Sequence, residues 1–222
     1  MELHQIKVYL NSSDSQNRLK ALTELRKYDA EDAIPLLLQA RNDPEFIVRS
    51  FVAMGSGRKQ SDEAFECLLQ MLTGDRDYNV RAEAANSIAL YGERSIAPLM
   101  TSFERDDHWL VRRSILAAMA EMTAPDALYQ ICQIGLLDED LTVRDAAIES
   151  MSLLAGSHRE ADALESLLSF VSADSWRTRY AVARALKSFN APSAKSALSY
   201  LSRDTDHRVV GAALESLVPQ EG

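Results

Sequence analysis

Apolar residues recur along this chain with the period of an α-helix, in blocks that repeat at intervals of 31 to 35 residues. In one block, Ala84, Ala85 and Ile88 stand three, four and seven positions after Arg81. Successive helical residues are turned by about 100°, so these three side chains share one face. A second apolar run precedes each such block, for example at residues 33–40, 64–72 and 163–171. Each repeat is therefore predicted to form two antiparallel helices.

A motif rich in aspartate opens the second predicted helix of each repeat. It reads DPEFIVR from Asp43, DRDYNVR from Asp75, DDHWLVR from Asp106 and DEDLTVR from Asp138, with weaker copies from Ser12, Ser172 and Asp204. The motif arginines are Arg18, Arg49, Arg81, Arg112, Arg144 and Arg179. Repetition at this period is the signature of stacked helical hairpins.

The predicted fold class is all-α, an α-solenoid of about seven short hairpins and about fourteen helices. We expect one domain over residues 1–222, with units at about 1–28, 29–59, 60–91, 92–122, 123–154, 155–189 and 190–222. The small numbers of glycine and proline, 8 and 6, agree with this and disfavour an all-β fold, which needs turn residues every few positions.

The motif arginine lies on the inward side of its helix and needs a partner there, because a buried charge is costly when unpaired. An aspartate stands six positions before it at Asp43, Asp75, Asp106 and Asp138. We interpret the two as a ladder, in which the aspartates cap the second helices or pair with arginines of their own or the next repeat. The alternative is an anion-binding row of arginines. Ala173 replaces the aspartate where the interval lengthens to 35 residues, so this junction is a candidate hinge or change of curvature.

The motif D-x-D-x-x-V-R, followed by an alanine-rich helix, resembles the HEAT-like repeats of the cyanobacterial phycobilin-lyase-like family over essentially the whole chain. The segments GRKQSDEAFECLLQML, DDHWLVRRSILAAM and DTDHRVVGAALESL carry a closer likeness to its small members. The resemblance implies a scaffold that binds a protein partner on its concave face, namely a phycobiliprotein or another phycobilisome component, in assembly, chromophore handling or degradation. It also implies two alternatives. One is a subunit of a bilin lyase, which would bind a bilin and need a second HEAT-like chain, and the other is a partner of an A-type iron–sulfur cluster carrier.

Two sets of positions are candidates for contacting a partner. Aromatic residues recur two positions before the motif valine, where they either close the loop against the preceding helix or form a ridge of anchors. Positions one, two, five and nine after the arginine point away from the apolar stripe, yet several are apolar, which predicts a binding groove. The predicted partner-binding residues are Phe51, Met54, Leu90, Trp109, Arg113, Ala117, Leu153, Trp176, Tyr180 and Arg184.

Composition and chemistry narrow the possible functions. The net charge of −9 and the lack of a dense basic patch argue against nucleic-acid binding. No run approaches the roughly 20 apolar residues of a membrane helix, and the N-terminus does not resemble a targeting peptide, so we expect a cytoplasmic protein. Cys67 and Cys132 are expected to be buried structural thiols.

No catalytic motif is found in the sequence. One enzyme with this repeat, deoxyhypusine hydroxylase, holds its di-iron centre with His-Glu pairs. In this chain His4, His108, His158 and His207 are followed by Gln5, Trp109, Arg159 and Arg208. Phosphate-binding loops and nucleophile elbows are absent as well. We therefore expect an interaction protein rather than an enzyme, with no metal and no cofactor unless a bilin is bound.

Overall fold

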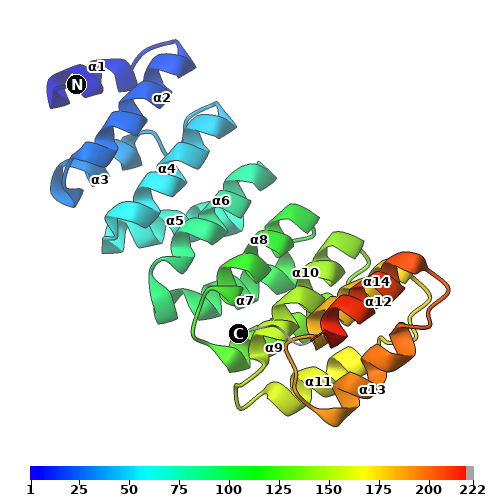
Figure 1. Cartoon of the computed structure of the whole chain (residues 1–222). Helices are drawn as coiled ribbons and strands as arrows, with labels where there is room; N and C mark the ends of the chain where they lie inside the picture. Colours follow the sequence, from blue (N-terminus) through cyan, green and yellow to red (C-terminus); the bar gives the residue numbers. More distant parts are fainter. Residues whose placement is uncertain (219–222) are drawn as a thin grey trace. The chain divides into compact units, whose positions relative to one another are not determined.

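The structure, a computed structural model, describes residues 1–218 of the chain, so the last four residues of the predicted final unit lie outside the described residues. The described chain is all-helical and contains fourteen α-helices (Figure 1). This confirms the predicted fold class, an α-solenoid of helical hairpins.

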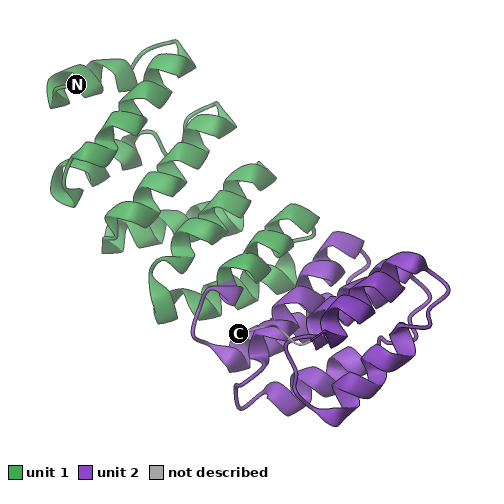
Figure 2. Ribbon diagram, viewed as in Figure 1, with its two compact units in different colours: residues 1–118 green, residues 119–222 purple. Residues whose placement is uncertain are grey.

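The chain divides into two compact units, Met1–Ala118 and Met119–Gly222 (Figure 2). The helices of unit 1 are α1 (Leu3–Leu10), α2 (Ser15–Glu24), α3 (Ala30–Gln39), α4 (Phe46–Lys59), α5 (Asp62–Gly74), α6 (Tyr78–Ala89), α7 (Ile96–Arg105) and most of α8 (Trp109–Ala120). Unit 2 contains α9 (Pro125–Leu136), α10 (Leu141–Met151), α11 (Glu160–Leu168), α12 (Trp176–Leu186), α13 (Pro192–Leu201) and α14 (His207–Leu217). Short 3-10 helices follow some of them, η1 (Leu25–Lys27), η2 (Gly92–Ser95) and η3 (Ser152–Leu154).

Within each unit the second helices of successive hairpins pack side by side. In unit 1, α2 packs on α4 and α4 on α6; in unit 2, α10 packs on α12 and α12 on α14. The alanines of the repeat allow this close approach, and Ala84 and Ala85 are fully buried. At Gly57 the backbones of α4 and α6 are closer still, because a Cβ added to Gly57 would lie 2.7 Å from the carbonyl oxygen of Ser87.

The third residue of the D-x-D motif explains why the second helices begin where they do. The side chain of Asp77 accepts a hydrogen bond from the backbone N–H of Asn79, which has no partner inside the helix. Asp140 and Asp206 cap α10 and α14 in the same way. These aspartates therefore fix the residue at which each of these second helices begins.

The first residue of the motif forms the predicted ladder. Arg49 donates from Nε to Oδ2 of Asp75 at 2.7 Å and from Nη2 to Oδ1 at 2.8 Å. Its Nη1 donates to the carbonyl oxygens of Asp43 and Pro44 in its own loop. The same bidentate pair recurs as Arg18–Asp43, Arg81–Asp106 and Arg179–Asp204, with Nε–Oδ2 distances of 2.6 Å in each.

The ladder interpretation is thus confirmed at four positions, and the direction that the sequence left open is settled there. Each aspartate pairs with the arginine of the preceding repeat, so every rung joins two neighbouring hairpins. The paired side chains are 6 to 17% exposed, which places these rungs among the buried ion pairs of the chain.

Candidate partner-binding site

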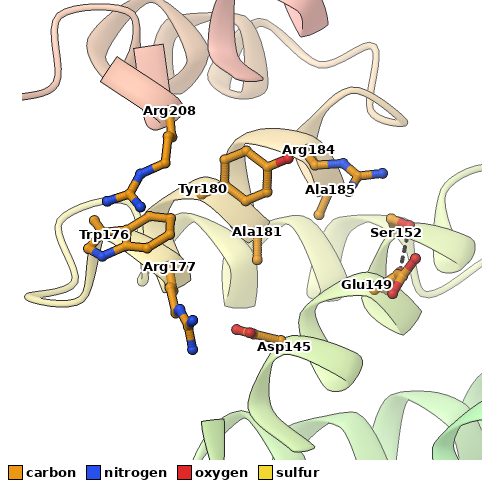
Figure 3. Close-up of a pocket in the computed structure, with 10 residues that line it drawn as sticks. All are labelled: Asp145, Glu149, Ser152, Trp176, Arg177, Tyr180, Ala181, Arg184, Ala185 and Arg208. Carbon is orange, nitrogen blue, oxygen red and sulfur yellow. Dashed lines mark hydrogen bonds between the residues drawn. The ribbon is translucent and has the colours of Figure 1, made fainter. Parts of the chain in front are cut away.

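A pocket of about 520 Å³ lies over α10, α12 and the start of α14 in unit 2 (Figure 3). It is lined by Asp145, Glu149, Ser152, Trp176, Arg177, Tyr180, Ala181, Arg184, Ala185 and Arg208. Three of the ten predicted partner-binding residues, Trp176, Tyr180 and Arg184, therefore come together in one hollow. Its size is within the usual range for sites that hold a small molecule or a few side chains.

Helix α12 supplies the floor of this pocket because its polar and aromatic residues share one face. Trp176, Tyr180 and Arg184 stand four residues apart, so each lies about one turn above the previous one. Arg177 and Ala181 lie beside them on the same face. The methyl group of Ala181 leaves space between the larger side chains, and this space is part of the pocket.

Positive charge gathers at the aromatic end of the pocket. The guanidinium of Arg208, from α14, stacks over the indole of Trp176 at 3.2 Å from the ring centroid. Asp206 holds Arg208 in place, since Nη2 of Arg208 donates to its Oδ2 at 2.7 Å, and this hydrogen bond lowers the pKa of Asp206. Within residues 1–218, no carboxylate forms an ion pair with the guanidinium of Arg177 or Arg184. Both groups are therefore available to an anionic ligand.

The opposite wall is acidic and comes from α10. Asp145 is partly buried, and burial raises the pKa of its carboxyl group, an effect that the nearby charges of Arg177 and Arg144 oppose. One oxygen of Asp145, Oδ1, is buried and has no hydrogen-bond partner in the described part of the chain. A buried polar atom in this state is uncommon in proteins and points to a missing hydrogen-bond donor. The pocket thus combines cationic, aromatic and hydrogen-bond-accepting groups.

The remaining predicted residues are not in this pocket. Phe51 and Met54 are partly buried and line a smaller hollow of about 240 Å³ in unit 1, formed by α2, α3 and α4. Leu90 and Leu153 are 54% and 57% exposed beyond the ends of α6 and α10. The other three predicted residues, Trp109, Arg113 and Ala117, lie on α8 and are exposed.

The aromatic residues that recur two positions before the motif valine are only partly packed. Phe46, Tyr78 and Trp109 are each 41% exposed at the first residue of their helices, although the motif position favours packing against the loop. Tyr78 instead stacks on the ring of His108, with centroids 3.8 Å apart and planes 7° from parallel. Phe46 and Tyr78 are therefore exposed at this motif position, as Trp109 is.

Five polar residues of the pocket were not among the predicted contacts, namely Asp145, Glu149, Ser152, Arg177 and Arg208. Asp145 and Glu149 nevertheless stand one and five positions after Arg144, at positions of the predicted groove. Arg177 could have been predicted, because it stands seven residues before Arg184 and therefore lies on the same face of the helix. Arg208 was not predictable in this way because it comes from the next hairpin. The described residues contain no cluster of three histidine, cysteine, aspartate or glutamate side chains that could hold a metal ion.

Comparisons with known proteins agree with the helical architecture. The family model of HEAT repeats matches residues 4–78, 65–152 and 152–218. The X-ray structure of YibA of Escherichia coli is similar over 98% of this chain and 92% of that chain, at 16% identity and a TM-score of 0.62. The complex of CpcE and CpcF of phycocyanin lyase from Nostoc sp. is similar over 98% of this chain and 95% of that chain, at 20% identity and a TM-score of 0.56. A search of curated proteins found no match. No helix within residues 1–218 is long and apolar enough to cross a membrane.

Proposed function

Because the chain belongs to the HEAT repeat family, we propose that it is an interaction scaffold that binds a protein partner through the exposed faces of its second helices. The observation that carries this proposal is the pocket on α12. It brings together Trp176, Tyr180 and Arg184, three residues that the sequence repeat predicts as partner contacts. Trp, Tyr and Arg are the residues that most often dominate the binding energy of protein interfaces.

The proposed partner is a phycobiliprotein or another component of the phycobilisome, bound in the cytoplasm. Two observations support this choice. The D-x-D-x-x-V-R motif resembles that of phycobilin-lyase-like proteins, and the fold is similar to that of the CpcE–CpcF complex of phycocyanin lyase. Binding would serve assembly, chromophore handling or degradation of the antenna.

The chemistry of the pocket favours a second candidate, a subunit of a bilin lyase. A linear tetrapyrrole carries two carboxylates, pyrrole N–H groups and a flat conjugated surface. Arg177 and Arg184 would hold the carboxylates, Trp176 and Tyr180 would pack on the flat surface, and the carboxylate of Asp145 at the pocket wall would accept a pyrrole N–H. In this function a second HEAT-like chain would complete the enzyme, which transfers the bilin to or from a phycobiliprotein cysteine.

A binding assay with purified phycocyanin tests the first proposal. The variant Tyr180→Asp places a charge in the pocket, and Tyr200→Asp makes the same chemical change on α13, where Tyr200 is 61% exposed and outside this pocket. We expect Tyr180→Asp to weaken binding at least tenfold and Tyr200→Asp to leave it unchanged, with similar melting temperatures for both. Equal binding by the two variants, or no binding by the unmodified chain, would count against the proposal.

The lyase alternative makes a different prediction for the same proteins. Free bilin added to the unmodified chain should shift its visible absorption band, and Tyr180→Asp should abolish the shift. Transfer of bilin to apo-phycocyanin should require a second HEAT-like chain. An unchanged absorption spectrum, together with no transfer of bilin in the presence of a second HEAT-like chain, would count against this alternative and leave the scaffold proposal standing.

A further inference from the structure

One rung of the arginine–aspartate ladder is vacant, at the junction of the fifth and sixth repeats in unit 2. By the register of the other rungs, Arg144 should pair with the residue six positions before Arg179. That residue is Ala173, which has no carboxylate. The next rung, Arg179–Asp204, is complete, with Nε–Oδ2 and Nη2–Oδ1 distances of 2.6 and 2.8 Å.

The vacancy leaves the guanidinium of Arg144 incompletely bonded. Its Nη2 donates to the carbonyl oxygen of Asp138 at 2.6 Å, whereas its Nε is buried and has no hydrogen-bond partner in the described part of the chain. Two other buried atoms share this condition, Oδ1 of Asp145 and Oγ1 of Thr178. In the described residues of unit 2, every buried side-chain atom without a partner thus lies on α10 or α12.

The backbone around the vacancy keeps the geometry of a complete rung. Nη1 of Arg179 donates to the carbonyl oxygens of Ala173 and Asp174 at 2.7 and 2.9 Å. Arg49 makes the equivalent bonds to Asp43 and Pro44 at 2.8 and 3.2 Å. The loop at Ala173 is therefore in place, whereas the guanidinium of Arg144 is turned, since its Nη2 donates to the loop carbonyl that Nη1 binds in a complete rung. Ala173 is partly exposed, so the vacant position borders solvent, although Nε of Arg144 itself is buried beneath it.

We infer that the vacant rung is a receptor for a carboxylate, which the protein partner supplies as an aspartate or glutamate side chain. In the four complete rungs a planar carboxylate accepts two hydrogen bonds along one edge of the guanidinium, from Nε and Nη2. The guanidiniums of Arg177 and Arg184, which form no ion pair in the described residues, lie on the adjacent helix face and favour an acidic segment. Asp145, the residue after Arg144 on α10, lines the pocket, whereas Arg144 and Ala173 do not, so the receptor and the pocket are separate features of the same pair of helices. The source of the carboxylate rests on the proposed function, but the receptor itself does not.

The receptor is tested with acetate as the probe, against chloride at constant ionic strength. Acetate at about ten times its dissociation constant should raise the melting temperature of the unmodified chain by about 3 to 6 °C. Asp75→Ala, which removes the carboxylate of a second rung, should show a larger rise in melting temperature with acetate than the unmodified chain. Ala173→Asp, which fills the natural vacancy, should melt higher without acetate and show no rise with it. In ¹H–¹⁵N spectra, the Nε–H signal of Arg144 should move with acetate and be absent from Arg144→Met.

An equal effect of acetate on the unmodified chain and on Ala173→Asp would mean an adventitious ion only and would overturn the inference. The partner is tested separately with Ala173→Asp and the matched variant Ala173→Ser. Ala173→Asp should weaken the binding of phycocyanin about tenfold or more because its own carboxylate occupies Arg144, and Ala173→Ser should bind normally. Unchanged binding by Ala173→Asp would refute the partner as the source of the carboxylate. If phycocyanin does not bind at all, the proposed function fails while the acetate result still decides the receptor.

Discussion

Removal of one ladder carboxylate should destabilise the protein strongly. In Asp75→Ala, the chain loses two hydrogen bonds from Arg49 and one from the backbone N–H of Asp77. The side chain of Arg49 is only 6% exposed, so its charge would stay buried with backbone carbonyls alone. Breaking a buried pair in this way costs about 3 to 5 kcal/mol, a large part of the roughly 5 to 15 kcal/mol that stabilises a typical domain.

Urea denaturation followed by circular dichroism at 222 nm measures this loss. Asp62→Ala is the matched control, because Asp62 also pairs with an arginine of the next hairpin, Arg94, but is 85% exposed. An exposed pair contributes about 1 kcal/mol or less, so the control should have nearly the midpoint of the unmodified chain. The double variant Arg49→Met with Asp75→Ala should recover most of the lost stability, since it leaves no unpaired charge. A loss below about 1 kcal/mol in Asp75→Ala, or equal losses in both single variants, would refute the structural role of the ladder.

The same rung makes stability depend on pH. Burial by itself raises the pKa of Asp75, but the hydrogen bonds from Arg49 and from the backbone of Asp77 outweigh it, so the pKa is lowered in the folded state. The unfolded state then takes up a proton at the higher pH, near the ordinary value of about 3.9. The contribution of the rung is therefore complete above that value and is lost as pH falls through the folded pKa. Asp75→Ala should show a flatter decline of the urea midpoint below about pH 5; a decline as steep as that of the unmodified chain would contradict this account.

Two further predictions concern packing. Gly57→Ala should lower the free energy of unfolding by about 1 to 3 kcal/mol, because its Cβ would lie 2.7 Å from the Ser87 backbone oxygen. Gly55→Ala should leave the free energy of unfolding nearly unchanged, since its Cβ meets only the flexible end of Leu37 and alanine favours the helix. Equal losses of stability in the two variants would show that the close approach of α4 and α6 does not determine the effect at Gly57. The second prediction is that both cysteines, of which Cys132 is fully buried with its thiol pKa raised by burial, are unreactive toward Ellman's reagent at pH 8 until urea unfolds the chain. Rapid reaction of the native protein would contradict the packing of α9.

The repeat made the hairpins and the ladder predictable, but not the direction of the rungs. Asp75 stands six positions before Arg81 and 26 after Arg49, and sequence spacing does not distinguish these partners. The choice depends on how neighbouring hairpins stack, which brings Asp75 within 2.7 Å of Arg49. Only the three-dimensional arrangement carries this information.

The residues of the candidate site also divide into those that the sequence predicts and those whose position depends on packing between repeats. Tyr180 and Arg184 were predicted because their spacing from Arg179 fixes the helix face on which they lie, and Trp176 because aromatic residues recur two positions before the motif valine. Arg208 reaches the pocket from α14, so its position depends on packing between repeats, whereas Asp145 on α10 stands one position after Arg144, at a position of the predicted groove. Helical periodicity predicts which side a residue faces, but it does not predict which residue of another repeat lies opposite.

The junction of α10 and α12 is the place where the chain departs most from its own pattern. The aspartate of the motif is replaced by Ala173, three buried polar atoms have no hydrogen-bond partner among residues 1–218, and the pocket extends over both helices and the start of α14. Departures from local consistency in a natural protein are expected at functional sites. A repeat that has merely lost an aspartate would gain stability from Ala173→Asp with no other effect. A binding site would gain stability from the same substitution and lose affinity for its partner, so the opposite signs of these two effects separate a site from a degenerate repeat.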